Sequence, residues 1–370
     1  MRPAWLEVNF DALAHNFNLL RAAAGQVQVI GVVKANAYGH GAVEVGKELL
    51  RLGAWGLAVA TTAEARELRR AGIVARILLM GSLHPQEAQD VVELDLIPSL
   101  STLEAAEALN ALGRPLAVHL EFDTGMGRVG FQPEEARMVR ERFAHYENLL
   151  IQGIYSHFAD AEEDEPWTKE QIERFQYVQQ VFGPGYFYHL CNTAGVVNYG
   201  QYGLSAVRPG IGLYGLLPNL GLRPIARLLA KPTQVKQLPA GRRIGYGGLY
   251  TTQGPEWIAT LPVGYADGMP RLVFNRATVR YFRAESLEPC VCPVVGRVSM
   301  DQITVRLPEP VGLEQVFEVA TPDFDPHSSL WGWAELTGSV SYEPAVRLAA
   351  RLPRVYVRAG EEVARVEPFG

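Results

Sequence analysis

Eight short apolar runs, separated by stretches of helical periodicity, dominate the first three-fifths of the chain. Buried parallel strands are nearly continuous apolar runs, and a crossover helix usually joins each strand to the next. This repeat therefore predicts a (β/α)8 barrel, a fold of roughly 200 residues or more. The fourth and seventh runs are weak strand candidates, so spacing alone also permits a doubly wound parallel sheet. The runs end at Val33, Ala60, Met80, Leu100, Phe122, Ser156, Leu190 and Val207.

Amphipathic segments lie between these runs and are predicted to be helices. Thr62 is a predicted N-cap, and Ser101 is another, with Glu104 three residues later completing a capping box. Pro133 suits a first helical turn. The predicted helices are Val43 to Leu52, Ala63 to Ala71, Leu103 to Leu112, Pro133 to Tyr146 and Lys169 to Phe182.

The pattern changes after about Leu222, where alternating strands bounded by Gly and Pro replace the helical stretches. Such strands are typical of an all-β domain. One helical stretch, 330–336, interrupts them, and a last strand pair is expected around 354–358. We therefore predict a barrel domain over 1–225, whose first few residues pair with the second domain, and a C-terminal β domain over 226–370.

Charge and cysteine content exclude several classes of protein. A net charge of -6 provides no basic surface for nucleic acid or anionic lipid. Polar residues interrupt every apolar cluster of the amino-terminal segment, so neither a secretory signal nor a membrane span is expected, and we expect a cytoplasmic protein. The cysteines are Cys191, Cys290 and Cys292, and their spacing matches neither a zinc knuckle nor a redox pair. No metal site is expected.

Lysine is scarce, because only five of the 34 basic residues are lysines. Lys34 follows the first apolar run, at the barrel end where reactive groups gather. A partly buried lysine there can have a lowered pKa and form a Schiff base with a carbonyl compound. A solvated rim lysine is the alternative interpretation.

Polar groups follow other runs at the same end. Arg128 lies in the segment EFDTGMGRVG, where three glycines allow a small anion to approach, although a surface arginine in a glycine-rich turn fits equally well. His157, His189 and Arg208 follow the sixth, seventh and eighth runs. Each histidine alone is more typical of a structural group, but together they indicate one site.

A phosphate site is predicted after the eighth run. The backbone N–H groups of Gly210 and Ile211 lie where barrels commonly hold phosphate, and the Thr193 hydroxyl can contribute. A reactive amine and a phosphate site together indicate pyridoxal 5'-phosphate, which carries an aldehyde and a phosphate.

Six motifs occur in order over nearly the whole chain: VVKANAYGHG, DTGMGRVG, HLCNTAG, VRPGIGLYGL, LPVGYADGMPR and VVGRVSMDQ. With them the sequence resembles the bacterial alanine racemase family. The resemblance implies an N-terminal (β/α)8 TIM barrel, a C-terminal β domain and a head-to-tail homodimer with shared active sites. It also implies a pyridoxal phosphate-dependent isomerase that interconverts L-alanine and D-alanine and supplies D-alanine for peptidoglycan.

The resemblance further implies roles for individual residues. Lys34 binds the cofactor and acts as the base on one face of the substrate, while Tyr265 of the other subunit acts on the opposite face. Arg208 hydrogen-bonds the pyridine nitrogen, steadied by His189, and a neutral His157 supports the network. Arg128 binds the substrate carboxylate. Further cofactor contacts are Tyr38, Asn192, Thr193, Gly210, Ile211 and Tyr342, and the second subunit contributes Arg297, Met300 and Asp301.

One position departs from the family pattern. Many members have a carbamate-bearing lysine seven residues before the substrate-binding arginine, and here that residue is Glu121. Our hypothesis is that the glutamate supplies the negative charge and orients Arg128 by a charge-assisted pair. The alternative is a purely structural acid inside the barrel.

Three rival functions share part of this sequence pattern. A decarboxylase of this architecture would need an acid facing the pyridine nitrogen, and Arg208 argues against one. A broader-specificity racemase would need a larger substrate pocket. A non-catalytic pyridoxal phosphate carrier would not need a second domain bearing Tyr265.

Overall fold

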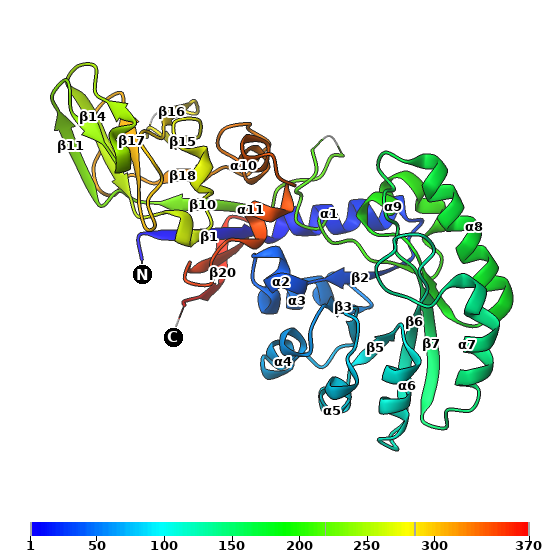
Figure 1. Cartoon of the computed structure of the whole chain (residues 1–370). Helices are drawn as coiled ribbons and strands as arrows, with labels where there is room; N and C mark the ends of the chain where they lie inside the picture. The colour runs from blue at the N-terminus through cyan, green and yellow to red at the C-terminus, as the bar shows by residue number, and fades with distance from the viewer. Residues whose placement is uncertain (1, 219, 285, 369–370) are drawn as a thin grey trace. The chain divides into compact units, whose positions relative to one another are not determined.

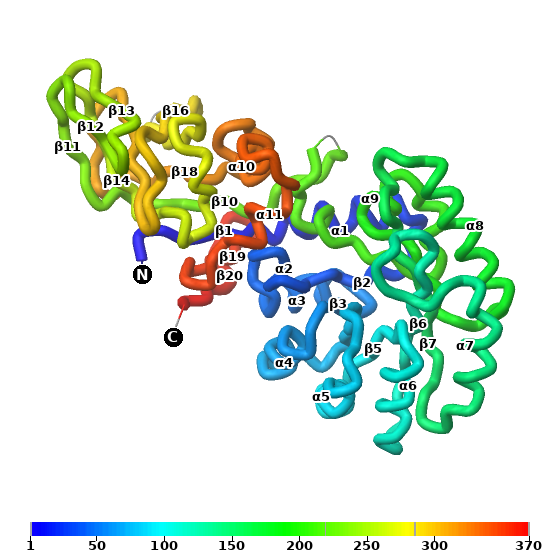
Figure 2. Tube along the Cα trace, viewed as in Figure 1, coloured from blue at the N-terminus to red at the C-terminus, as the bar shows by residue number. Residues whose placement is uncertain are grey.

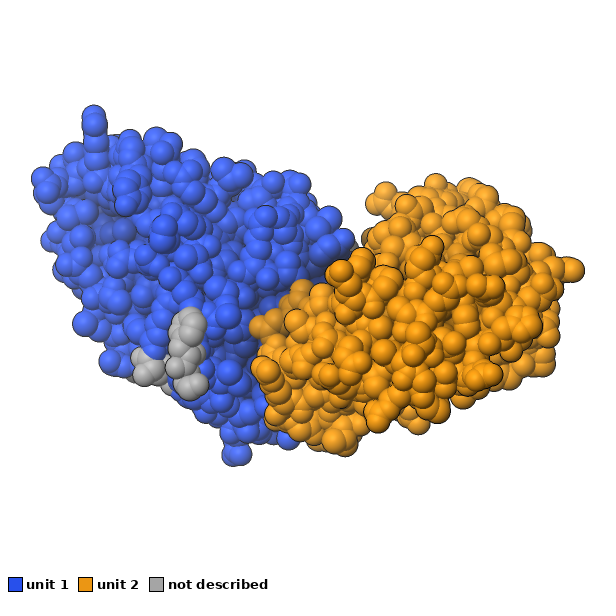
Figure 3. Space-filling view, turned by 60° about the horizontal axis from the view of Figure 1, so that its bottom comes forward, with its two compact units in different colours: residues 1–16, 38–44, 214–370 blue, residues 17–37, 45–213 orange. Residues whose placement is uncertain are grey.

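The computed structural model describes residues 2–218, 220–284 and 286–368, and the chain divides into two compact units (Figure 3). The barrel unit consists of Phe17–Ala37 and Val45–Leu213. The β unit consists of Met1–Asn16, Tyr38–Glu44 and Tyr214–Gly370. Each unit is therefore built from separate segments of the chain.

Eight parallel strands close the barrel, and each pairs with its neighbours in chain order (Figure 1). The last strand pairs with the first, with Gln28 opposite Ala206. The predicted (β/α)8 fold is confirmed, and the doubly wound sheet is excluded. The strands are β2 (Gln28–Val32), β3 (Gly56–Val59), β4 (Ile77–Leu79), β5 (Ile97–Leu100), β6 (Leu116–Glu121), β7 (Leu149–Tyr155), β8 (Phe187–His189) and β9 (Ala206–Val207).

Helices alternate with these strands, but both predicted N-caps are displaced by one residue. Thr61, not Thr62, has the extended backbone of an N-cap and accepts a hydrogen bond from the Glu64 N–H. Thr102, not Ser101, caps the next predicted helix. Sequence alone did not distinguish adjacent hydroxyl residues. The helices are α1 (Phe10–Ala23), α2 (Lys34–Tyr38), α3 (Ala42–Arg51), α4 (Thr62–Arg70), α5 (Ala88–Glu93), α6 (Leu103–Asn110), α7 (Ala136–Phe143), α8 (Glu165–Phe182) and α9 (Thr193–Tyr199).

The β unit contains a seven-stranded sheet in the order β16-β15-β18-β10-β1-β19-β20, a three-stranded sheet β11-β14-β17 and a hairpin β12-β13. Two helices, α10 (Leu330–Thr337) and α11 (Tyr342–Val346), accompany them. The strands are β1 (Ala4–Asn9), β10 (Ala226–Ala230), β11 (Gln234–Leu238), β12 (Arg243–Ile244), β13 (Tyr250–Thr251), β14 (Glu256–Leu261), β15 (Thr278–Phe282), β16 (Pro289–Pro293), β17 (Ile303–Leu307), β18 (Phe317–Ala320), β19 (Arg354–Arg358) and β20 (Glu361–Val366).

The amino-terminal strand β1 lies inside the large sheet. It pairs antiparallel with β10 and parallel with β19, so strands from the first and last parts of the chain lie side by side (Figure 2). Ala4, Leu6 and Val8 are fully buried, because alternate side chains of a strand point to the same face. Among the described residues, no helix has both the length and the apolar character needed to span a membrane.

Gly39 is required where the segment Tyr38–Glu44 packs within the β unit. Its φ is +85°, and a Cβ built on it would lie 2.1 Å from the carbonyl oxygen of Ala345. A Gly39→Ala change should therefore destabilise the protein by about 2 kcal/mol or more, since both strain and overpacking oppose it. The matched control is Gly241→Ala, which has φ +80° but no atom within 4 Å of the added Cβ. Thermal unfolding should show a clearly larger loss for Gly39→Ala, and equal losses would contradict this role of Gly39.

Candidate active site

Lys34 begins α2 two residues after the end of β2, on a backbone of unusual conformation. Ala35, Asn36, Ala37 and Tyr38 all have φ between 52° and 54°. Left-handed backbone costs roughly 1–2 kcal/mol for each non-glycine residue, and such strain concentrates at functional sites. The Ala35 N–H donates a hydrogen bond of 2.7 Å to Glu64 Oε1, which holds the start of the turn.

The electrostatic environment of Lys34 favours a neutral amine. Burial, followed by the positive charge of Arg128, lowers the pKa of the Lys34 ammonium, and the Glu64 carboxylate opposes this only partly. A lysine with a lowered pKa is a better nucleophile near neutral pH. The predicted reactive amine therefore lies in surroundings that suit it.

Arg208 follows β9 and is almost completely buried. One of its Nη2–H groups donates to the Ser156 carbonyl oxygen at 2.6 Å, and Nη1 lies 2.5 Å from His189 Nδ1. Within the part of the chain that the structure describes, the buried Nε has no hydrogen-bond partner. A buried N–H rarely lacks an acceptor, so this atom indicates where a ligand acceptor belongs.

Arg208 determines the protonation of the two histidines behind it. Arginine only donates hydrogen bonds, so His189 Nδ1 must accept and its Nε2 must carry the proton. That Nε2 lies 2.8 Å from His119 Nδ1, which accepts in turn. Burial, together with Arg208, holds the pKa of His189 well below its usual value. Burial also lowers the pKa of His119 to about 4.

Glu121, at the end of β6, is buried against Tyr155 and Ser99. The Tyr155 hydroxyl donates to Glu121 Oε2 at 2.7 Å, and Ser99 Oγ lies 3.4 Å from the same oxygen. Among the described residues no hydrogen bond joins Glu121 to Arg128, so the direct pair expected from the sequence is absent. Tyr155 and Ser99 come from the flanking strands β7 and β5 and occupy this carboxylate oxygen instead.

Tyr155 connects Glu121 with Arg208. The guanidinium carbon of Arg208 lies 4.7 Å from the centre of the Tyr155 ring, a cation–π arrangement. Burial raises the pKa of Glu121, whereas the Tyr155 hydrogen bond and the charges of Arg208 and Arg128 favour its carboxylate. Glu121 therefore influences both arginines through the electric field and through Tyr155.

His157 and Arg128 line one small cavity together with Glu121 and Ser156. Burial and the charges of Arg208, Arg128 and Lys34 lower the pKa of His157 to about 3, so this imidazole is neutral. Its Nε2 lies 3.4 Å from Asn192 Nδ2, and Asn192 is also the N-cap of α9. The structure thus brings the predicted barrel residues together at one end of the barrel.

The predicted phosphate site is a turn closed by Thr193. Its Oγ1 accepts hydrogen bonds from the Gly210 N–H at 3.1 Å and the Gly212 N–H at 3.2 Å. A Cβ built on Gly212 would lie 2.6 Å from Thr193 Cγ2, so glycine is needed for this close approach. Thr193, Gly210 and Ile211 therefore form one local group.

The remaining predicted residues belong to the β unit. The Tyr38 ring stacks on Tyr214 with 4.8 Å between centroids, and burial with the neighbouring Tyr342 raises the pKa of Tyr38 to about 12. Tyr38 is therefore a hydroxyl donor at neutral pH.

Tyr265, Met300 and Asp301 lie close together in the β unit and are exposed. Tyr265 starts a 3-10 turn over Tyr265–Asp267, and its N–H donates to the Ser299 carbonyl oxygen at 3.0 Å. The Tyr265 side chain is 41% exposed and that of Met300 53%. Arg297 is half-buried, and its Nε has no partner among the described residues.

Sequence reasoning missed His119, Tyr155 and Ser99, which support the arginines, and Asp267 beside Tyr265. One signal was available, because His119 lies two residues before Glu121 and therefore points to the same side of β6. Tyr155 and Ser99 stand within the apolar runs that end at Ser156 and Leu100, and nothing in that pattern marks them as partners of Glu121.

Comparison with known proteins gives a consistent result. Residues 8–218 match the family model described as alanine racemase, N-terminal domain, and residues 225–356 match alanine racemase, C-terminal domain. The chain is similar to an alanine racemase of Carboxydothermus hydrogenoformans, with 37% identity covering 96% of this chain and 100% of the relative. An alanine racemase structure from Clostridium difficile 630 has a TM-score of 0.91 and 33% identity, and covers 100% of both chains. A histidine racemase from Leuconostoc mesenteroides has a TM-score of 0.88 and 27% identity, covering 96% of this chain and 98% of that one.

Proposed function

Because the chain belongs to the alanine racemase family, a family of isomerases, we propose that it interconverts L-alanine and D-alanine. The observation that carries this proposal is the presence of two particular side chains, Lys34 and Arg208, in the barrel unit. Lys34 is an amine with a lowered pKa, and Arg208 has a buried Nε–H that still needs an acceptor.

The same two groups fit pyridoxal 5'-phosphate as the cofactor. In this proposal the Lys34 amine would hold it covalently, the Arg208 Nε–H would donate to its ring nitrogen, and Asn192 and a neutral His157 would also contact it. Its phosphate group would be held by Tyr38, Thr193, Gly210, Ile211 and Tyr342. When bound, this cofactor withdraws electrons from the substrate Cα and so makes the α-proton acidic.

Racemisation needs a proton donor and a proton acceptor on opposite faces of the substrate. We assign Lys34 to one face and the partner subunit's Tyr265 to the other. The exposure of Tyr265 and Met300 on the single chain supports a homodimer with shared active sites, because tyrosine and methionine are enriched at interfaces relative to other surfaces. Met300, Asp301 and Arg297 belong to the same contribution from the partner.

Arg208 also limits which reaction is performed. An arginine side chain stays protonated and only donates, so the ring nitrogen that it faces receives no proton. The neutral His189 keeps the guanidinium in place without adding charge. Decarboxylation, which would call for an acid at this position, is therefore disfavoured.

Arg128 is proposed to bind the substrate carboxylate, and Glu121 to tune the two arginines. A Glu121→Gln change should lower kcat about tenfold, because it removes a buried negative charge that the Tyr155 hydroxyl and both guanidinium groups face. Steady-state kinetics with L-alanine checks this. The control is Ser99→Ala, which removes the 3.4 Å contact with Glu121 Oε2 and the 2.6 Å hydrogen bond with the Tyr155 hydroxyl but leaves the Glu121 charge in place, so it should lower kcat less than Glu121→Gln does. Equal kinetics for Glu121→Gln and the parent would leave Glu121 a purely structural acid.

The proposed activity is tested by chiral chromatography of products formed from L-alanine and, separately, from D-alanine. Serine and histidine belong in the same assay, because the histidine racemase among the structural neighbours supports a broader specificity as the second candidate. A cellular role in supplying D-alanine for peptidoglycan in the cytoplasm is tested by rescue of a bacterium that requires D-alanine. Protein that binds the cofactor but racemises none of these amino acids would contradict the proposal.

A further inference from the structure

A buried carboxylate closes the turn that carries Tyr265. Asp267 is the last residue of this turn and has no exposed surface. It accepts hydrogen bonds from Arg2 Nη1 at 2.5 Å and Nη2 at 2.8 Å. Arg351 donates to it from Nε at 2.7 Å and Nη2 at 3.1 Å, and the Gly264 N–H donates at 3.0 Å. Two arginines and one backbone N–H thus converge on Asp267.

These contacts join Tyr265 to the segment that carries Met300 and Asp301. Arg351 Nη2 forms an ion pair of 2.8 Å with Asp301 Oδ1, in addition to its bonds with Asp267. The Ala266 N–H donates to the Met300 carbonyl oxygen at 3.0 Å. Arg2 Nη2 donates to the Pro262 carbonyl oxygen at 2.7 Å, before the turn begins. One carboxylate therefore anchors both segments that the proposed function assigns to the partner's active site.

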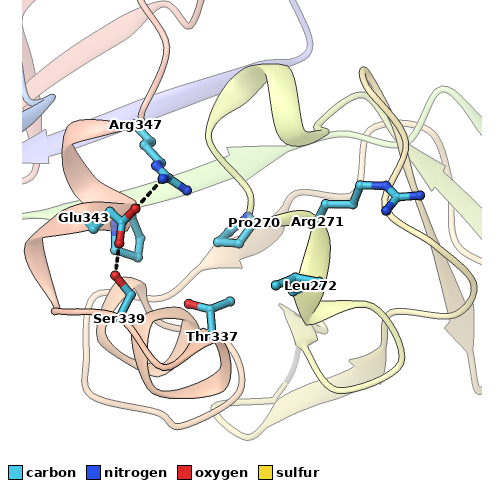
Figure 4. A pocket seen from close by; sticks show the side chains of 8 residues that line it. Pro270, Arg271, Leu272, Thr337, Ser339, Glu343 and Arg347 are labelled. Carbon is cyan, nitrogen blue, oxygen red and sulfur yellow. Dashed lines mark hydrogen bonds and ion pairs between the residues drawn. The ribbon is translucent and has the colours of Figure 1, made fainter.

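Beyond the turn, the chain is fully buried at Met269 and Val273 and borders a cavity between these two positions. Pro270 and Leu272 line a cavity of about 300 Å³, with Pro344 of α11 and Thr337 of α10 on the facing wall. Figure 4 shows Arg271 turned away from this cavity, while Glu343 binds Ser339 and Arg347 on the wall that faces Pro270 and Leu272. The ion pairs of Asp267 add polar constraints at the Tyr265 turn itself.

The surroundings of Asp267 favour its charged carboxylate form. Burial opposes ionisation, but the hydrogen bonds from Arg2, Arg351 and Gly264 outweigh it and hold the pKa of Asp267 below its usual value. Hydrogen bonds between ions are shorter and stronger than neutral ones, and arginine adds directional constraint through its planar fork.

We propose that Asp267, held between Arg2 and Arg351, is a positioning residue that sets the location of the Tyr265 phenol and of Met300 and Asp301. The inference rests on the proposed function, in which Tyr265 and Met300 serve the partner subunit. Asp267 touches neither substrate nor cofactor in this scheme. It acts by holding the Tyr265 turn in the one geometry that suits proton transfer.

Asp267→Asn keeps the shape of the side chain and removes its charge. The variant should lose about 100-fold in kcat with little change in KM, since a displacement of the order of 1 Å has that effect on a reacting group. In D2O, the enantiomer whose α-hydrogen faces Lys34 should still exchange it. The other enantiomer should not, because its α-hydrogen faces the displaced Tyr265. Glu318→Gln is the matched control, since Glu318 is also buried between two arginines, Arg227 and Arg280, but lies in β18.

A second measurement is independent of turnover. In the cofactor-free protein, hydrogen exchange followed by mass spectrometry should become faster at residues 264–267 in Asp267→Asn and stay unchanged there in Glu318→Gln. Arg351→Gln, which leaves the Arg2 pair intact, should give the same pattern to a smaller degree, and Arg351→Lys should restore part of the activity. If Asp267→Asn does not fold, hydrogen exchange at residues 264–267 is measured in Arg351→Gln instead.

Two outcomes would overturn the inference: unchanged exchange at 264–267, or equal loss of α-hydrogen exchange in both enantiomers. Tyr265→Phe separates this failure from failure of the proposed function. If Tyr265→Phe itself shows no difference between the enantiomers, the assignment of Tyr265 is wrong. If it shows the difference and Asp267→Asn does not, only the positioning role is wrong.

Discussion

Purified Lys34→Ala protein is expected to be colourless and to lose racemase activity by about a thousandfold or more, because it lacks both the covalent link to the cofactor and one of the two bases. The parent protein is expected to be yellow after incubation with pyridoxal phosphate. Visible absorbance measures the bound cofactor, and chiral analysis of alanine measures the racemase activity. The lowered pKa of Lys34 adds a pH dependence. The neutral amine is the reactive form, so cofactor binding to the apoprotein should speed up as pH rises and level off below the usual lysine pKa.

The matched control for this prediction is Lys169→Ala. Lys169 lies in α8 of the same unit, is exposed and forms an ion pair with Glu165. Its replacement should alter neither colour nor turnover, because exposed ion pairs contribute little. A Lys34→Ala protein that binds the cofactor and racemises alanine like the parent would contradict the assignment of Lys34.

Mixing two inactive variants, Lys34→Ala and Tyr265→Phe, is expected to restore activity. In a homodimer whose sites each combine one subunit's Lys34 with the partner's Tyr265, the mixed dimer has one site with both residues intact. Random re-pairing makes half of the dimers mixed, so about a quarter of the parent activity should return. The two variants are re-paired by mild denaturation or by coexpression, and the alanine assay then measures the recovered activity.

The control for subunit mixing pairs Lys34→Ala with Arg208→Gln. Both residues belong to the barrel unit, so neither site of a mixed dimer would contain both. No recovery is expected. Recovery in this control pair, or its absence in the Lys34 and Tyr265 pair, would contradict the shared active site.

The barrel strands were predictable because a strand that is buried on both faces is a nearly continuous apolar run in the sequence. Each apolar run needed only to be located, and its carboxyl end then indicated where Lys34, His157, His189 and Arg208 would stand. These groups do gather at one end of the barrel. Local periodicity therefore carried information about the site as well as about the fold.

Contacts between segments that are far apart in the sequence have no comparable pattern. The parallel pairing of β1 with β19 joins the two ends of the chain, and Arg2 reaches Asp267 across 265 residues. The partners of Glu121 were also hidden, since its carboxylate contacts Tyr155 and Ser99 on flanking strands and, among the described residues, has no hydrogen bond with Arg128. The N-caps moved by one residue because backbone conformation, not residue type, selects between adjacent hydroxyls.

The chain of neutral imidazoles behind Arg208 has one more consequence. With the pKa of His119 near 4, that of His157 near 3 and that of His189 also far below normal, none of these rings gains a proton when cellular acidity drifts around neutrality. Arg208 keeps its own proton throughout. These three histidines thus keep a constant charge around neutral pH, so the pH dependence of cofactor binding originates in Lys34 and not in them.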